Sequence, residues 1–300
     1  MKMFSYEEKC IMNLGDCYTL LYGYIARQLL EQFGEPGEKA VREATRRFGV
    51  DRATVTRAKH LAVGAKINML NLFTLYHDLP GDPRFRRELQ EINSQERVSH
   101  TLVCPMADTW KAHGQMAIGR IYCEEFHPAC YSAYAYGHTQ VNLAKTLTQE
   151  GDEYCAFNVV LRPTNLPQEL RPVCFEEYDP AYAAPDFPPQ EVSGKKGFGM
   201  LSIKLYSHLL QTAVEQLGEE AAQAVEKGLE NFAQAAAGIL RDSAGKERII
   251  DAAYIADNVP IEMDTAKDPL WEQYGACRAA ERMRDRFCKT LQRELGLSGS

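Results

Sequence analysis

The sequence predicts an α+β protein, in which a helical N-terminal segment leads into a small antiparallel sheet with helices and an all-helical C-terminal half follows. Two observations predict this class. Apolar residues recur at helical spacing through roughly the first 75 residues and again from residue 200 to the end. Between residues 98 and 161, by contrast, short β-prone runs alternate with turn residues and short helical patterns.

The first helix is marked at both ends. Ser5 followed by Glu8 forms a capping-box pattern, and Gly34 is a typical helix stop. An apolar stripe between them predicts one buried face, at Ile11, Leu14, Tyr18, Leu21, Ile25 and Leu29. Further helices are expected at about 38–48 and 51–75, with Gly49 between them.

The middle of the chain predicts the sheet. Residues 98–103 have the pattern of a strand, 105–113 of a short helix with Pro105 in its first turn, and 115–126 of a second helix. Because proline lacks an amide hydrogen, we expect a break at Pro128. Residues 140–147 and 154–161 then predict two strands around a turn at 150–153.

Three regions are expected along the chain: an α+β catalytic or ligand-binding domain at 1–162, a linker at 163–199, and a helical domain at 200–300. The linker is predicted because it contains seven of the fourteen prolines and several glycines. The helical half has the features of a degenerate repeat, since Tyr22–Phe48 aligns with Tyr206–Phe232 at a constant offset. Its last helix is expected to begin at Asp268-Pro269 and to end at Gly296.

Composition restricts the class of protein. The formal net charge of −7 argues against a partner that is bound through phosphates, and no apolar run is long enough for a membrane span. Nine cysteines without paired spacing, and a start without a signal-peptide pattern, favour a cytoplasmic location. One stretch differs: residues 39–60 carry seven Lys/Arg against two acids, and 41–60 have the rhythm of a helix-turn-helix.

Candidate site residues gather in residues 98–160, where cysteines and histidines cluster. Cys104, Cys123 and His127 are the candidate catalytic residues, and Asp108 is the candidate acid or base. Trp110, Tyr122 and His138 are candidates for lining a substrate pocket. Three interpretations stay open: a thiolate nucleophile, a zinc ion held by Cys104, Cys123 and Cys155, or cysteines that pack as small apolar side chains.

The order of these motifs resembles a known family. Cys104-Pro105 before a short helix, Tyr122-Cys123 about twenty residues later, and a closing Gly151-Asp152-x-x-Cys155 strand resemble the L-2-amino-thiazoline-4-carboxylic acid hydrolase family over roughly residues 15–162. The closing strand is also similar to four-vinyl-reductase-type small-molecule-binding domains, which can hold zinc. The other zinc positions of those domains have no counterpart here.

The resemblance implies a hydrolase that opens a C–N bond in a small cyclic amide or amidine, a thiazoline-carboxylate-like heterocycle. The expected partner is a small-molecule substrate, with zinc as a compatible cofactor that the sequence does not require. A homo-oligomer is compatible with the chain, and a nucleic acid is disfavoured. The alternative is a non-enzymatic small-molecule-binding sensor, with DNA binding through segment 41–60.

Overall fold

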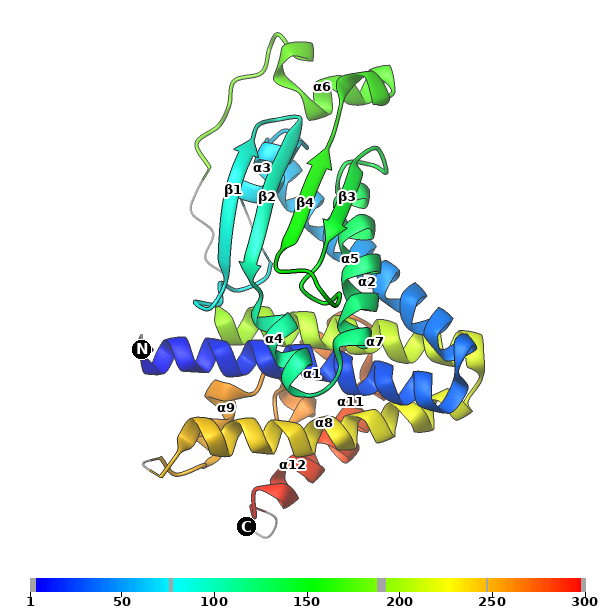
Figure 1. The fold of residues 1–300 in the computed structure, drawn as a ribbon, viewed down its shortest axis with the longest axis vertical. Helices are drawn as coiled ribbons and strands as arrows, with labels where there is room; N and C mark the ends of the chain where they lie inside the picture. The colour runs from blue at the N-terminus through cyan, green and yellow to red at the C-terminus, as the bar shows by residue number, and fades with distance from the viewer. Residues whose placement is uncertain (1–3, 76–77, 188–192, 247, 298–300) are drawn as a thin grey trace.

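A computed structural model describes residues 4–75, 78–187, 193–246 and 248–297. Long helices form a layer at the base of the molecule, and a four-stranded antiparallel sheet stands on this layer (Figure 1). The C-terminal half is helical wherever it is regular. The α+β class predicted from the sequence is therefore confirmed.

Helix α1 (Tyr6–Phe33) begins at the predicted capping box. The Ser5 hydroxyl accepts a hydrogen bond from the Glu8 amide at 3.1 Å, and the Glu8 carboxylate accepts one from the Ser5 amide at 2.8 Å. The helix ends at Gly34, whose φ of 58° is readily adopted by a residue without a Cβ. Five of the six predicted stripe residues are buried, at Leu14, Tyr18, Leu21, Ile25 and Leu29.

Two helical hairpins build the base layer. The first joins α1 to α2 (Glu35–Ala62) at Gly34, and the second joins α7 (Gly194–Leu217) to α8 (Glu220–Ala244) through Gly218. Helix α1 packs along α8, and α2 packs on α7. The aligned pairs Tyr22/Tyr206 and Phe48/Phe232 are all fully buried. The similarity between the two segments thus corresponds to two hairpins of the same kind, which pack against each other.

One hydrophobic core joins the two halves of the chain. It combines residues of α1, α2 and α5 with residues of α7 and α8, so the segments expected at 1–162 and 200–300 share their interior. Shorter helices complete it: α9 (Ala252–Asn258), α10 (Leu270–Gln273), α11 (Cys277–Arg282), a π-helical turn (Met283–Cys288) and α12 (Lys289–Glu294). The single last helix predicted from 268 is wrong, because Gly275, with φ of 64°, separates α10 from α11.

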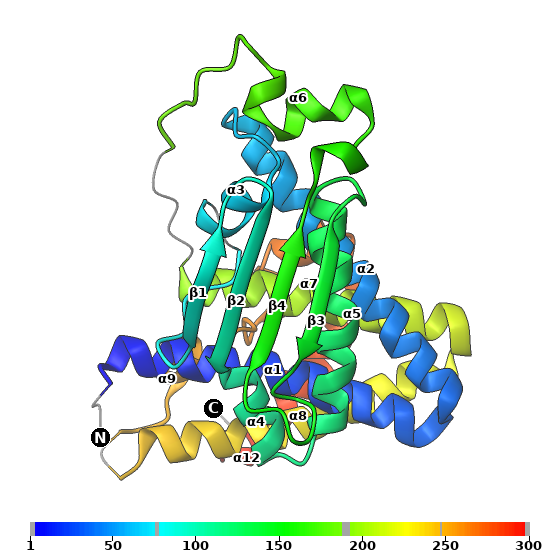
Figure 2. The ribbon, with the colours of Figure 1, turned by 45° about the horizontal axis from the view of Figure 1, so that its top comes forward.

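The sheet has the strand order β1-β2-β4-β3, with every neighbouring pair antiparallel. Its strands are β1 (Arg86–Ile92), β2 (Glu96–Val103), β3 (Gln140–Lys145) and β4 (Cys155–Val160). The last three were predicted. Helices α4 (Pro105–Ala112) and α5 (Met116–Tyr134) connect β2 to β3, and α5 runs beside the sheet (Figure 2), while α3 (Met69–Thr74) contacts β2.

Two predicted breaks are wrong, since both α2 and α5 are continuous. Pro128 lies inside α5, where it removes one backbone hydrogen bond from a helix that the packing of α2 holds in place. Gly49 lies inside α2, and a Cβ there would be 3.0 Å from the Phe126 carbonyl oxygen. This glycine therefore permits a close helix crossing and makes no turn.

The proline-rich connector contains short helical turns where an extended linker was expected. Its described part includes α6 (Arg171–Cys174) and three 3₁₀ turns, at 163–165, 168–170 and 176–178. Cys174 and Phe175 are fully buried in a second, smaller core. Lys66 donates hydrogen bonds to the Pro172 carbonyl and to Asp179, both at 2.6 Å. Residues 188–192 lie outside the described residues, and the last six residues of the expected linker already belong to α7.

Across the described ranges, every helix is either too short or too polar to cross a lipid bilayer.

The close crossing of α1 and α8 gives a test of the packing. A Cβ at Gly228 would lie 2.7 Å from the Ile25 Cα, which is backbone and cannot move aside. We expect Gly228→Ala to lower the free energy of unfolding by about 1–3 kcal/mol in chemical denaturation. Gly238→Ala in the same helix meets nothing within 4 Å and should raise it by about 0.5–1 kcal/mol. Equal effects of the two variants would contradict this packing.

Candidate functional site

The three predicted thiols lie together where β2, β4 and α5 meet α4. Cys104 caps the N-terminus of α4, Cys155 opens β4, and Cys123 lies in the middle of α5. Cys104 and Cys155 both raise the pKa of Cys123, and Cys155 raises that of Cys104, which shows their proximity. The Cys155 sulfur also accepts a hydrogen bond from the Leu147 amide at 3.3 Å.

Burial is the main influence on the pKa values of these thiols. It raises the pKa of Cys104 to about 11, although the backbone amides of Ala107 and Met106 at the start of α4 favour the thiolate. Burial raises the pKa of Cys123 and of Cys155 as well. All three groups are therefore thiols at neutral pH, and Cys104 is the one that a helix N-terminus would stabilise once it loses its proton.

The donor set does not fit a metal ion. Among the described residues, no group of three or more His, Cys, Asp or Glu side chains is placed to hold one. The zinc ligand set of Cys104, Cys123 and Cys155 is thus brought together without acquiring the geometry of a site. We derive no metal-dependent step from it.

His127 lies one turn beyond Cys123 on α5 and faces the sheet. Its ring centroid is 4.9 Å from that of Phe157 on β4, and the ring also contacts Tyr131. Burial, together with the positive charges of Arg52, Arg87 and Arg97, lowers the pKa of His127 to about 3. Its Nδ1 atom is buried without a hydrogen-bond partner in the described part of the chain. This histidine is neutral near pH 7, with an unused polar atom.

The face of the sheet that α5 covers, here called the inner face, carries polar residues that the sequence analysis missed. Cys155 and Phe157 define it on β4, and the register places Thr101 and Ser99 of β2 beside them. Arg87 of β1 pairs with Thr101, and Leu89 pairs with Ser99. Arg97 follows on the same face, two residues from Ser99. Strand alternation in β2 could have indicated these neighbours, but nothing in the sequence distinguished them from ordinary strand residues.

A buried ion pair closes the helix side of this region. Arg52 on α2 forms two hydrogen bonds to Asp78, and its guanidinium lies over the rings of Phe126 and Phe48. Asp78 raises the pKa of Arg52 well above its usual value, against the opposing effect of burial. Arg52 is therefore a fixed positive charge near His127.

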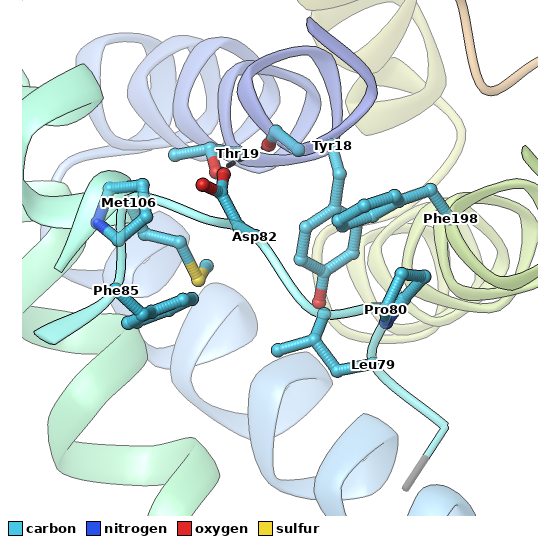
Figure 3. Close-up of a pocket in the computed structure, with 10 residues that line it drawn as sticks. Tyr18, Thr19, Leu79, Pro80, Asp82, Phe85, Met106 and Phe198 are labelled. Carbon is cyan, nitrogen blue, oxygen red and sulfur yellow. Dashed lines mark hydrogen bonds between the residues drawn. The ribbon is translucent and has the colours of Figure 1, made fainter. Parts of the chain in front are cut away.

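A small pocket lies at the start of α4, between this helix, α1, α7 and the loop before β1 (Figure 3). Pro105 and Met106, which directly follow Cys104, form part of its wall, together with Tyr18, Phe85 and Phe198. At its rim, Arg84 forms ion pairs with Asp82 at 2.6 Å and with Asp16 at 2.8 Å. These contacts fix the loop before β1 onto α1. The pocket wall is mostly apolar.

The other predicted site residues lie elsewhere. Asp108 is exposed on α4. Trp110 and Tyr122 are buried in the main core, where the Trp110 indole donates to the Thr19 carbonyl and the Tyr122 hydroxyl bonds to that of Tyr18. His138 follows α5, close to Gln140, which pairs with Val160 at the end of β4 remote from Cys155. In the described part of the chain, none of these four side chains forms a hydrogen bond with the three thiols.

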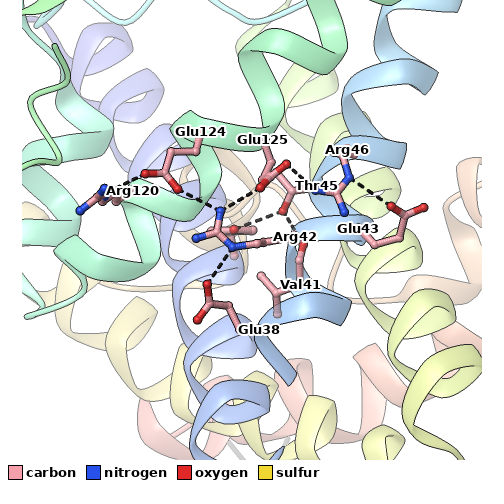
Figure 4. A network of polar contacts seen from close by, with 10 residues as sticks. Glu38, Val41, Arg42, Glu43, Thr45, Arg46, Arg120, Glu124 and Glu125 are labelled. Atoms are coloured by element: carbon pink, nitrogen blue, oxygen red, sulfur yellow. Dashed lines mark hydrogen bonds and ion pairs between the residues drawn. The ribbon is translucent and has the colours of Figure 1, made fainter. Parts of the chain in front are cut away.

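The helix-turn-helix interpretation of segment 41–60 is wrong, and its arginines are used within the molecule. Figure 4 shows Arg42 between Glu38, Glu124 and Glu125, and Arg46 between Glu43 and Glu125. The remaining arginines of the segment also have partners inside the chain: Arg47 pairs with Glu43 and Glu215, Arg52 with Asp78, and Arg57 donates to the Ala133 carbonyl. The local positive charge holds α2 to α5 and α7.

Comparison with known proteins supports the resemblance. Residues 17–159 match the model of the L-2-amino-thiazoline-4-carboxylic acid hydrolase family, so the predicted resemblance is confirmed over this part of the chain. The match includes the three thiols, His127, and β1 and β2. No curated protein and no solved structure matches the chain.

The raised pKa of Cys104 predicts how fast iodoacetamide alkylates it. Only the thiolate reacts, so well below a pKa of about 11 the rate should rise about tenfold per pH unit. We expect this rise from pH 7 to pH 10, measured by mass spectrometry of the peptide that contains Cys104. A rate that levels off near pH 8 would contradict the burial described here.

The lowered pKa of His127 predicts acid sensitivity. Below pH 6.5 the unfolded chain protonates this histidine, but the folded protein does so only near pH 3, so the unfolded state gains protons and stability falls with pH. Between pH 7 and pH 5 the wild type should lose about 2 kcal/mol more than His127→Phe, measured by urea denaturation. An identical loss in both proteins would show that His127 titrates alike in both states.

Proposed function

We propose that this protein hydrolyses a C–N bond in a small cyclic amidine or amide, at the cluster formed by Cys104, Cys123 and His127. The family match over residues 17–159 supports the substrate class. The observation that carries the choice of site is the position of Cys104 at the N-terminus of α4, beside the other two thiols. Cys104 is the nucleophile in this proposal.

The reaction proceeds through a covalent intermediate. The Cys104 sulfur bonds to the amidine carbon while its proton passes to the ring nitrogen. That nitrogen takes a second proton from the exocyclic amino group, and the ring C–N bond breaks to release an amine. Water then adds to the same carbon and expels Cys104 as a thiol. Bonds, protons and electrons balance with water as the only co-reactant.

The groups around Cys104 have distinct roles in this reaction. The amides of Ala107 and Met106 favour the Cys104 thiolate when the proton leaves. A basic amidine nitrogen accepts that proton directly, which removes the need for Asp108, whose side chain is exposed. The buried Nδ1 of His127 accepts a hydrogen bond from an N–H group of the substrate. Cys123 packs beside Cys104 and excludes water from the sulfur.

Activity on L-2-amino-thiazoline-4-carboxylate tests the proposal. We expect the wild type to open the ring, and Cys104→Ala to lower kcat at least a thousandfold, because the nucleophile is lost. Cys277→Ala is the matched control: it removes an exposed thiol on α11, outside the matched region, and should leave the rate unchanged. Full turnover by Cys104→Ala would refute the role of this thiol.

A non-enzymatic sensor is the second candidate, and one observation favours it. Burial raises the pKa of all three clustered thiols, as expected for cysteines that pack as small apolar side chains. In that case the wild type would bind small heterocycles without turnover, and Cys104→Ala would bind them equally well. Calorimetric titration with product analysis separates the two candidates.

A further inference from the structure

Arg97 on β2 faces an aromatic ring instead of a carboxylate among the described residues. Its guanidinium lies 4.3 Å from the centroid of the Phe73 ring, and within the described ranges it forms no ion pair or side-chain hydrogen bond. Other arginines of these ranges, such as Arg52 and Arg84, have raised pKa values because carboxylates face them. For Arg97 the direction is reversed, because burial and nearby Arg87 lower its pKa against the opposing effect of Tyr131.

Two further polar groups near Arg97 are also unused. The Ser99 hydroxyl is two residues away on the inner face and fully buried, and it has no hydrogen-bond partner among the described residues. The Nδ1 atom of His127 is likewise buried without a hydrogen-bond partner among the described residues. Arg97 is close enough to lower the pKa of the His127 ring. A buried polar group without a partner costs about 1–3 kcal/mol, so two such atoms near the half-buried guanidinium of Arg97 indicate a missing ligand.

The charged residues of the region indicate which charge this ligand carries. Arg87 lowers the pKa of Cys104, of Cys155 and of His127, so its positive charge reaches from the thiols to the histidine. Arg52 adds a third positive charge near His127, but Asp78 already neutralises it. Within the described ranges, neither Arg97 nor the solvent-exposed Arg87 pairs with a carboxylate. An anion fits here, and a planar one suits the guanidinium fork.

We propose that Arg97, with Ser99 two residues away on β2 and Arg87 farther along the same face, binds the carboxylate of a small-molecule ligand on the inner face of the sheet. The proposal rests on the proposed function for the class of ligand, because the carboxylate held there belongs to a small heterocyclic acid. Arg97 is then a residue that sets specificity for acidic over neutral heterocycles. The carboxylate supplies the anion that the guanidinium lacks.

The experiment uses probes that cannot be hydrolysed as amidines. L-Thiazolidine-4-carboxylate and thiazolidine differ only in the carboxylate, and both are titrated into the full-length protein by calorimetry. We expect the wild type to bind the acid more tightly than the neutral ring. Arg97→Gln should weaken binding of the acid about 10- to 100-fold and leave binding of thiazolidine unchanged, since the charged hydrogen bonds are lost. Arg97→Lys should restore part of the affinity, because charge is kept without the fork.

Two controls keep the result interpretable. Arg86→Gln removes the same charge from the neighbouring, exposed position on β1 and should not change affinity for the acid. Ser99→Ala should weaken binding of the acid while the fold keeps its stability, because the lost hydroxyl has no partner within the described ranges. Equal affinity of wild type and Arg97→Gln for the acid, or no binding of the acid by the wild type, would overturn the proposal. Because no turnover is measured, loss of the hydrolase proposal would leave this result intact.

Discussion

The close approach of α2 to α5 at Gly49 is the constraint on which the site depends. Helix α5 carries Cys123 and His127, and its position against the sheet is set from behind by α2. With no side chain at Gly49, the α2 backbone comes within contact distance of Phe126 and Ala129. The ion pairs of Arg42 and Arg46 with Glu125 then fix the rotation of the two helices (Figure 4). Helix α5 is thereby held with Glu125 toward α2 and His127 toward the sheet.

This crossing also explains why local signals failed at two places. Glycine and proline are the strongest local indicators of breaks, and the sequence therefore predicts a turn at Gly49 and a break at Pro128. Both residues lie where the two helices pack, and tertiary contacts outweigh the local preference there. The capping box at Ser5, the glycine stop at Gly34 and three of the four strands depend on neighbours in sequence, and these were predicted correctly.

The site was predictable only in part, for a related reason. Cys104, Cys123 and Cys155 were identified because thiols are rare and cluster along the chain, and the fold does bring them together. Trp110 and Tyr122 were chosen for their ring chemistry, but a large aromatic side chain on the buried face of a helix serves the core first. Arg97 and Ser99 were not predicted because their significance depends on missing partners: an anion for the guanidinium and a hydrogen-bond partner for the hydroxyl among the described residues. An unpaired charge or hydroxyl is visible only after every neighbour has been placed.

The openness of the sheet at β1 bears on the range of molecules that the protein can accommodate. Helix α5 packs on β3 and contacts β4 through His127 and Phe157. The residues of β1 are largely solvent-exposed, and Leu89, beside Ser99 on the inner face, is 55% exposed. A molecule anchored on Arg97 is therefore enclosed on the α5 side and meets bulk water on the β1 side. The α5 side restricts the size of the ring, whereas a substituent that points past Leu89 on the β1 side extends into solvent. For the ligand proposed above, this arrangement predicts a narrow tolerance for the heterocycle and a broad tolerance for what is attached to it.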